Sequence, residues 1–141
     1  MNTDLETAKK LLEGSSYTCV LCREDRVLTA QQRGVRPLLE WLDSGTAADG
    51  FSAADKVVGR AAAMLYCLLH VRAVYARILS RGALEVLSGH GIDVQYDTLV
   101  PFIENRDKTG LCPMEEATLP LTDPADAPAA IRRKLQQLLH S

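Results

Sequence analysis

Hydrophobic positions in the first third of the chain predict a helix, a hairpin and a second helix. Apolar residues recur at helical spacing over residues 3–13, and a glycine follows them, which is typical of a helix and its end. The runs at 17–23 and 27–30 flank a charged turn, a pattern that predicts two strands of a β-hairpin. Residues 35–42 predict a short helix with a proline in its first turn.

The middle of the chain predicts a long helix followed by alternating strands and helices. Apolar residues of the run 52–69 cover nearly every face of a helix, so we expect one helix that is buried almost all round. Residues 71–79 are rich in β-branched and aromatic types and predict a strand, and 80–88 predict a helix. Short strands are expected at 92–96 and at 99–103, where an internal proline places the second strand at a sheet edge or at a bend.

The last part of the chain predicts two helices. One begins at Cys112, and the other occupies about residues 124–140, where leucines and an isoleucine form one stripe. Strands that alternate with helices after an opening hairpin imply an α/β fold, with a mixed sheet between helix layers. A length of 141 residues suits one domain, with a core over about 3–120 and the C-terminal helix attached to it.

Charge and composition narrow the classes of function. Sixteen basic and 18 acidic residues give a net charge of −2, so no net positive field attracts nucleic acid or an anionic membrane, and we expect neither as a partner. The uncharged run 61–71 is too short for a membrane span, which needs roughly 20 apolar residues. The N-terminus is acidic and unlike a signal peptide, so the four cysteines are expected as reduced thiols in the cytoplasm.

The first candidate site is the pair Asp55 and Lys56 near the start of the long predicted helix. Ser52 and Asp55 have the spacing of a capping box, which is a purely structural interpretation. The functional interpretation is an acid and a lysine at the mouth of a buried helix, where they hold or protonate a polar ligand. Gly59 lies inside this helix, which suggests a close approach of the helix backbone to the sheet.

The second candidate site is the segment Cys112-Pro113-Met114-Glu115. Proline suits the first helical position, which places Cys112 at the N-cap and Glu115 at the third helical position. The helix dipole favours a thiolate at Cys112, whereas the following glutamates disfavour it. The preceding loop holds Asn105, Arg106 and Thr109, which we interpret as ligand-positioning residues; the alternative is an ordinary capped helix after a charged loop.

The remaining cysteines and histidines do not predict a metal or redox site. Cys19 and Cys22 have the spacing of a redox motif, but in a strand residues three apart face opposite sides. Cys67 lies in the most apolar helix and is interpreted as a core residue. The three histidines have no partner at metal-ligand spacing, so we expect no metal and no cofactor.

Three motifs together resemble a known family. The segments 33–40, 54–63 and 105–115 are similar to those of an uncharacterised prokaryotic domain of unknown function with a cytidine-deaminase-like fold. The resemblance covers roughly residues 3–120. It implies a three-layer α/β/α sandwich around a mixed sheet of about five strands, in agreement with the predicted element order.

The same resemblance locates a site and shows departures from deaminase chemistry. True cytidine deaminases take a zinc ligand and a glutamate from one helix start and two cysteines from the next. The corresponding positions here are Asp55 and Cys112. No His-x-Glu lies near Asp55, and Cys112-Pro113 reverses the order of the Pro-Cys-x-x-Cys motif, so the zinc ligands of a deaminase are absent.

Two classes of function follow from the sequence. In the first, an unidentified small molecule binds where the two candidate sites meet. Asp55 and Lys56 then act as acid, base or ligand-orienting groups, with Cys112 as nucleophile or polar lining and Glu115 beside it. In the second, the motifs are core and capping features of a non-catalytic module that binds a protein or another copy of itself.

Overall fold

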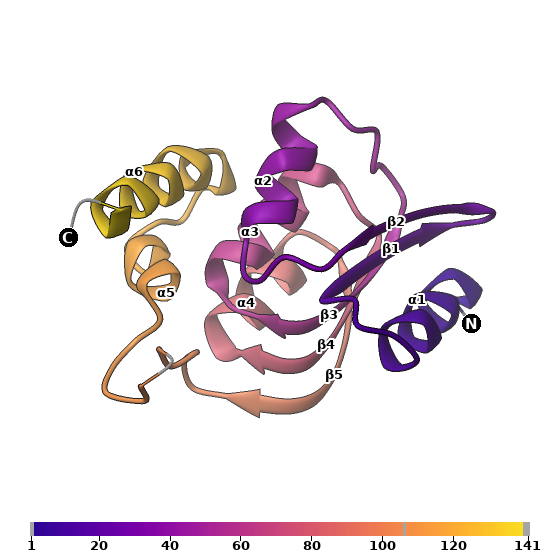
Figure 1. Cartoon of the computed structure of the whole chain (residues 1–141), viewed down its shortest axis with the longest axis horizontal. Coiled ribbons are helices and arrows are strands. Elements are labelled where there is room, and N and C mark those ends of the chain that lie inside the picture. The colour runs from indigo at the N-terminus through magenta and orange to yellow at the C-terminus, as the bar shows by residue number, and fades with distance from the viewer. Residues whose placement is uncertain (1, 106, 140–141) are drawn as a thin grey trace.

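One mixed five-stranded sheet organises the chain. The computed structural model describes residues 2–105 and 107–139, whose elements follow one another as shown in Figure 1. The strands are β1 (Cys19–Arg23), β2 (Arg26–Ala30), β3 (Ser52–Val58), β4 (Ala73–Ser80) and β5 (Asp93–Val100). The helices are α1 (Thr3–Glu13), α2 (Arg36–Asp43), α3 (Arg60–Leu69), α4 (Arg81–Gly89), α5 (Pro113–Thr118) and α6 (Ala127–Leu139), with a 3₁₀ turn, η1, at Pro124–Asp126.

The sheet combines an antiparallel part with a parallel part. Its strand order is β2-β1-β3-β4-β5. Strand β1 pairs antiparallel with both β2 and β3, in a register that sets Cys19 opposite Asp55. Strands β3, β4 and β5 are parallel and are joined through α3 and α4. Strand β3 is therefore central, and its carboxyl end leads directly into α3.

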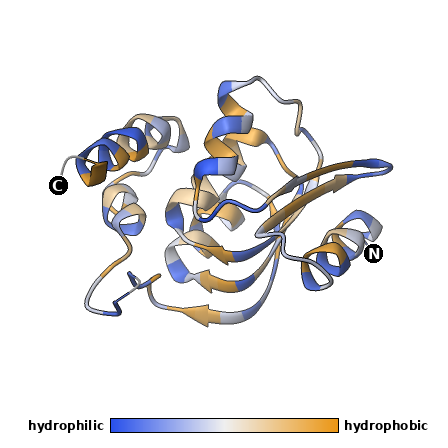
Figure 2. Cartoon of the chain, viewed as in Figure 1, coloured by the Kyte–Doolittle hydropathy of each residue, from blue (hydrophilic) through white to orange (hydrophobic). Residues whose placement is uncertain are grey.

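Helices cover both faces of the sheet and make three layers. On one face, α1 packs its apolar stripe on β1, β3 and β4, in a small cluster that includes Leu5, Leu12 and Tyr75. On the other face, α2, α3 and α4 enclose the larger core, which reaches Ile131 of α6. Figure 1 shows α1 on its own side of the sheet. Figure 2 shows much hydrophobic colour on the inner strands, as strands covered on both faces require, whereas the edge strands β2 and β5 are largely exposed. The expected three-layer α/β/α fold with a mixed five-stranded sheet is confirmed.

The prediction of a single helix over 52–69 was wrong. This run contains strand β3, Gly59 and helix α3. A central strand that is covered on both faces has no alternating polar positions, so its sequence looks like that of a buried helix. The expected capping box is also wrong, because Ser52 lies in the strand and its hydroxyl accepts a hydrogen bond from Asn2 at 2.9 Å.

The other predicted elements agree with the structure apart from one merger. Residues 92–96 and 99–103 were predicted as two strands, but a single strand, β5, runs from Asp93 to Val100. Residues 101–103 lie beyond its end, so the strand predicted there was wrong in its second half. The hairpin, the N-terminal helix and the C-terminal helix form as predicted. Within the described part of the chain, no helix combines the length and the apolar character that a membrane crossing requires.

Candidate functional site

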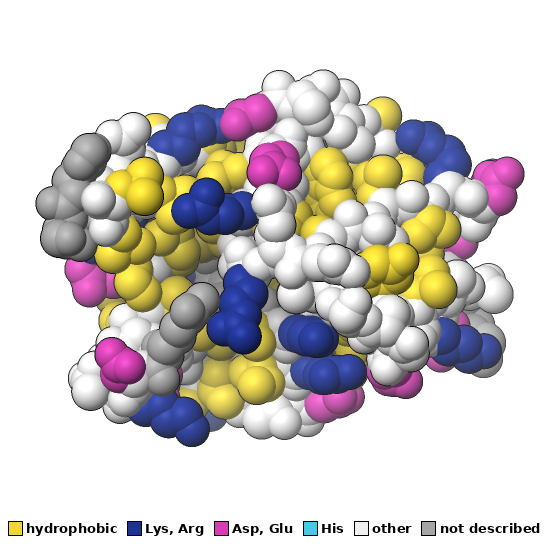
Figure 3. All heavy atoms as spheres, in the orientation of Figure 1, with side chains coloured by type: hydrophobic (Ala, Val, Ile, Leu, Met, Phe, Trp, Pro, Cys, Tyr) yellow, Lys and Arg dark blue, Asp and Glu magenta, His cyan; other side chains and the backbone are white. Residues whose placement is uncertain are grey.

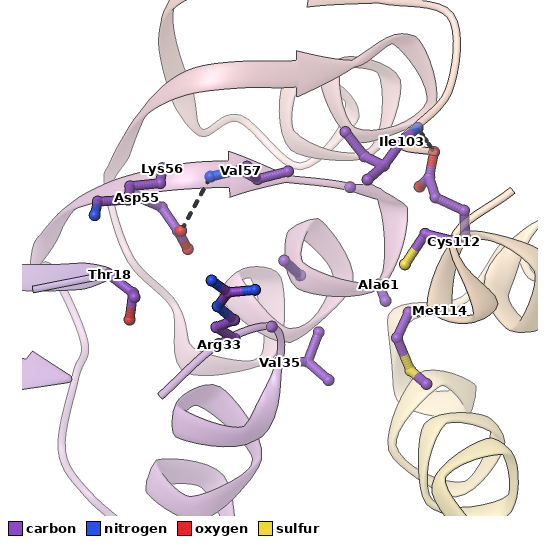
Figure 4. A pocket seen from close by; sticks show the side chains of 14 residues that line it. Thr18, Arg33, Val35, Asp55, Lys56, Val57, Ala61, Ile103, Cys112 and Met114 are labelled. Carbon is purple, nitrogen blue, oxygen red and sulfur yellow. Dashed lines mark hydrogen bonds between the residues drawn. The ribbon is translucent and has the colours of Figure 1, made fainter. Parts of the chain in front are cut away.

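A cavity of about 420 Å³ opens where β3 meets the starts of α3 and α5. This volume lies within the range of small-molecule sites, roughly 300–1,000 Å³. The strand β3, the loop between β2 and α2, and the segment around α5 all contribute to its walls. Figure 4 shows Thr18, Arg33, Asp55 and Lys56 grouped at one end, whereas apolar side chains form the other end.

Asp55 is a buried acid at the polar end of the cavity. It lies in strand β3 rather than at a helix start, so the predicted placement on a helix was wrong. Only 9% of the residue is exposed, and its Oδ1 accepts the Val57 backbone N–H at 3.4 Å. Burial raises the pKa of this carboxyl from 3.8 to about 6, although its hydrogen bonds, first that from Tyr66, oppose the rise. Asp55 therefore changes its charge close to neutral pH.

A buried chain of hydrogen bonds holds Asp55 from below the cavity. The Tyr66 hydroxyl of α3 donates to Asp55 Oδ2 at 2.7 Å, and the Cys19 sulfur lies 3.0 Å from the same hydroxyl. Tyr66 is fully buried and Cys19 nearly so, and burial raises the pKa of both groups. Because a neutral thiol donates only weakly, the order S–H to O–H to carboxylate satisfies all three groups. The arrangement fixes how the Asp55 carboxyl is turned.

Two cations share the polar end of the cavity with Asp55. Lys56 is the next residue of β3, and Arg33 lies on the exposed loop before α2, beside Gly34 with its positive φ of 71°. Figure 4 shows the Arg33 guanidinium directed toward the same space as the Asp55 carboxyl. Within residues 2–105 and 107–139, neither cation forms an ion pair or a hydrogen bond through its side chain.

Cys112 supplies a thiol to the opposite end. As predicted, it is the N-cap of α5 with Pro113 in the first turn, but its side chain makes no capping hydrogen bond. Its backbone N–H donates instead to Ile103 at 2.8 Å. The residue is partly exposed, and Figure 4 shows its sulfur directed into the cavity. Cys112 and Asp55 thus lie in the walls of one cavity.

Glu115 joins the cavity wall to the start of α3. Its Oε1 accepts the Arg60 backbone N–H at 2.5 Å, and its Oε2 accepts the Ile103 N–H at 2.9 Å. Only 5% of the residue is exposed. Glu115 was predicted as part of the chemistry beside Cys112, but both oxygens serve as acceptors for backbone amides. The carboxylate therefore caps α3 across the cavity, which is a structural role.

Gly59 explains how Glu115 comes so close. Gly59 is the N-cap of α3, and a Cβ added to it would lie 2.8 Å from Glu115 Oε1 and 3.1 Å from the Ile103 side chain. The close approach expected for this glycine exists, but it is to a side chain of the α5 segment and not to the sheet. Only glycine leaves room for the carboxylate that caps α3.

The predicted ligand-positioning residues lie elsewhere. Asn105 and Thr109 bond to each other through both side-chain and backbone atoms, at 3.1 and 3.0 Å, which stabilises their own loop. Thr109 lines a separate, more open hollow with Phe102 and Lys108. Neither residue lines the cavity beside Asp55. Arg106, the third predicted residue, lies outside the described residues.

Sequence reasoning missed two residues of this site. Tyr66 was not singled out within the long predicted helix, because no local pattern distinguishes it from a core aromatic. Arg33 was noted only within a motif, because nothing local shows that its loop reaches β3. Among the described His, Cys, Asp and Glu side chains, no group of three is placed to hold a metal ion.

Comparisons with known proteins match both a family model and solved structures. The model of the family described as TM1506, domain of unknown function (DUF1893), matches residues 7–135. The crystal structure of a DUF1893 family protein (TM1506) from Thermotoga maritima is 24% identical, covers 95% of this chain and 91% of its own, and has a TM-score of 0.85.

A second solved structure is more distant. The dCMP deaminase from the cyanophage S-TIM5, in apo form, is 14% identical, covers 67% of this chain and 94% of its own, and has a TM-score of 0.45. A search of curated protein sequences found no match.

Proposed function

The chain belongs to the DUF1893 family, and we propose that it binds a small organic molecule in the cavity beside Asp55 and exchanges a proton with it. The reaction class is general acid–base chemistry at the Asp55 carboxyl. The molecule is expected to bind in the cavity between β3 and α5.

One observation carries this proposal. A carboxyl group with a pKa of about 6 lies in the wall of a cavity of small-molecule size. Near neutral pH such a group is present in both protonation states, which is the condition for efficient proton transfer. Buried carboxyls are costly to a fold, and perturbed acids in cavities are enriched at functional sites.

The other groups of the cavity have supporting roles in this proposal. Tyr66 turns the Asp55 carboxyl by its hydrogen bond to Oδ2. Lys56 and Arg33 orient the ligand from the polar end, and Cys112 is polar lining within reach of it. Glu115 and Gly59 keep the α5 wall in place. The proton exchanged with the ligand belongs to Asp55.

The experiment that tests the proposal fills the cavity. Val57 lines the cavity and is 43% exposed, so Val57→Trp adds bulk there with little disturbance of the core. Val27 is 44% exposed on β2 and does not line the cavity, so Val27→Trp is a matched control. A library of small metabolites is screened against the three proteins by ligand-observed NMR.

We expect compounds that bind the wild type and Val27→Trp but not Val57→Trp, and whose binding changes in Asp55→Asn. Binding that survives in Val57→Trp places the ligand elsewhere and contradicts the proposal. Absence of any ligand for the wild type across the library also contradicts it.

We also propose that the protein works in the cytoplasm, since its four cysteines are all free thiols. Fractionation of cells with an antibody to the chain tests this location. The alternative function, a protein-binding or self-assembling module, stays a prediction, and size-exclusion chromatography with light scattering tests its self-assembly form.

A further inference from the structure

We infer that the ligand of the cavity carries an organic anion, a carboxylate or a phosphate, which Arg33 and Lys56 bind while the apolar end holds the rest of the molecule. This inference rests on the proposed function and names the class of molecule that the site takes. Three features of the described residues support the inference: the cavity has a polar and an apolar end, its two cations have no partner among these residues, and the Asp55 carboxylate already accepts hydrogen bonds.

The cavity is divided into a polar and an apolar end. Arg33, Lys56 and Thr18 lie at one end with Asp55, as Figure 4 shows. Val35, Ala61, Ile103 and Met114 line the other end. Apolar walls gain from covering an apolar body, whereas the polar end rewards a charged or hydrogen-bonding group. The cavity therefore suits an amphipathic molecule with its head toward β3.

The cations of the polar end are available to a ligand. Neither Arg33 nor Lys56 bonds another described residue through its side chain. The Thr18 hydroxyl, in contrast, already donates toward backbone oxygens of Ala30 and Gln32. Figure 3 shows Lys and Arg side chains gathered near the middle of the face that it displays. Two free cations favour an anionic head, and a guanidinium pairs with carboxylate or phosphate through two parallel bonds.

Asp55, the acid at the polar end of the cavity, already accepts hydrogen bonds from the protein itself. Asp55 Oδ2 accepts from Tyr66, and Oδ1 accepts from the Val57 backbone. Glu115, the other acid in the walls, has both oxygens on backbone amides. A cationic ligand head would have to compete for these oxygens and would meet two unpaired cations. An anionic head finds two free donors instead.

Binding of an anion here must be coupled to protonation of Asp55. A negative charge placed beside a carboxylate raises the pKa of that carboxyl, so the complex takes up a proton, and the anion binds tighter at lower pH. The titratable and charged groups that face Asp55 or share its cavity are Cys19 from β1, Tyr66 from α3, Arg33 from the loop before α2, Lys56 from β3, and Cys112 and Glu115 from the α5 segment. Burial raises the pKa of Asp55 to about 6, so this carboxyl is the group that takes up the proton when the anion binds.

Four matched probes separate the possibilities. 4-Phenylbutyrate, 3-phenylpropyl phosphate, 3-phenylpropanol and 3-phenylpropylamine share one apolar body and differ only in the head group. Each is titrated into the full chain, and amide chemical-shift changes at Ala61 and Ile103 report binding in the cavity. We expect the carboxylate or the phosphate to bind about tenfold tighter than the alcohol, as a charge-assisted hydrogen bond implies. Which of the two binds tighter distinguishes the two anions.

Charge variants assign the head group. Arg33→Gln should weaken binding of the preferred anion about tenfold, to the level of the alcohol, and Lys56→Met should weaken it about threefold. Arg36→Gln is the matched control, because Arg36 lies three residues further on, is exposed and does not line the cavity. Lowering the pH from about 7.5 to about 5.5 should tighten binding of the anion several-fold in the wild type and not in Asp55→Asn.

Several outcomes overturn the inference. The inference requires the amine and the alcohol to bind more weakly than the anions. Equal or tighter binding of either one in the cavity refutes the inference and leaves the proposed function standing. An Arg33→Gln variant that binds the anion like the wild type also refutes it. If all four probes leave the cavity amides unchanged at millimolar concentration, the anion inference is wrong, and the library screen with Val57→Trp decides separately whether the cavity binds small molecules.

Discussion

Arg60 and Glu115 are joined by two reciprocal contacts, because the side chain of each forms a hydrogen bond with a backbone group in the segment of the other. Glu115 Oε1 accepts the Arg60 backbone N–H at 2.5 Å, while Arg60 Nε donates to the carbonyl of Thr118, one turn after Glu115, at 3.0 Å. Arg60 Nη2 donates further along, to Leu121. The start of α3 and the whole of α5 are therefore joined by bonds to backbone groups, and this joint holds one wall of the cavity against the other.

Removal of the Glu115 carboxylate should loosen this joint. Glu115→Ala leaves the N–H groups of Arg60 and Ile103 without their acceptor. We expect the free energy of unfolding to fall by about 3 kcal/mol, as measured by urea denaturation. Glu116→Ala is the control, because Glu116 is exposed and only pairs with Lys134 on the surface, so its loss should stay within about 0.5 kcal/mol. Equal losses in the two variants would show that Glu115 does not cap α3.

Gly59 and Glu115 should be energetically coupled. Gly59→Ala puts a Cβ 2.8 Å from Glu115 Oε1, so we expect a loss of about 2 kcal/mol in the wild type and a smaller loss in a Glu115→Ala background. A double-mutant cycle by denaturation measures the difference. Gly89→Ala, where nothing lies within 4 Å of the added Cβ, should be neutral or slightly stabilising. Additive losses would show that the carboxylate is not what excludes a side chain at position 59.

Asp55 should make stability fall as the pH rises. Its pKa is about 6 in the folded chain against 3.8 as the reference for the unfolded chain, so the folded state holds a proton that the unfolded state releases between these values. The contribution of Asp55 to the free energy of unfolding is therefore most favourable below about pH 3.8 and is lost as the pH rises through about 6, by about 3 kcal/mol in total. Urea denaturation at several pH values, on wild type and Asp55→Asn, isolates this contribution as the difference between the two curves. Parallel curves would contradict it.

Tyr66 should lower the pKa of Asp55. Because the Tyr66 hydroxyl stabilises the carboxylate, Tyr66→Phe should move the pKa of Asp55 above about 6. Carbon-detected NMR of the labelled carboxyl follows the titration directly. The matched control is Tyr75→Phe, since Tyr75 donates to the exposed Asp97 at 2.6 Å outside the cavity. A pKa of Asp55 that stays unchanged in Tyr66→Phe would remove Tyr66 from the site.

Cys112 should be the first thiol to be alkylated. It is partly exposed in the cavity, whereas Cys19, Cys22 and Cys67 are buried and burial raises the pKa of each. Peptide mapping after timed alkylation of the native protein ranks the four. A preferred anionic probe should slow the reaction at Cys112 by covering the cavity. Faster labelling of Cys19 than of Cys112 would show that the hydrogen-bonded groups Cys19, Tyr66 and Asp55 are not buried.

Local patterns predicted most elements, but they failed where two elements share one apolar run. The hairpin and α1 were predicted because their periodicity contrasts with polar flanks. Strand β3 was missed because burial on both faces removes that contrast, and Gly59 was interpreted as a residue inside a helix when it separates two elements. Residue types alone did not distinguish these cases.

Only part of the candidate site was predicted from the sequence, because local patterns do not show which segments meet in the fold. Asp55, Lys56, Cys112 and Glu115 line one cavity, although Asp55 reaches it from a strand. The loop residues Asn105 and Thr109 were misplaced, because their hydrogen bonds to each other leave no trace in spacing. Tyr66 and Arg33 were missed because their roles depend on how α3 and the loop before α2 lie against β3, which residue spacing does not show.

The joint between Arg60 and Glu115 also affects the order in which parts of the chain fold. The bond spans 55 positions of sequence, whereas the β1–β2 hairpin closes over a few residues. Because closing the longer loop costs more chain entropy, we expect α5 to dock after the sheet and α3 have formed. We therefore expect the cavity to be one of the last features to form, and the ligand proposed for it to slow unfolding without accelerating folding.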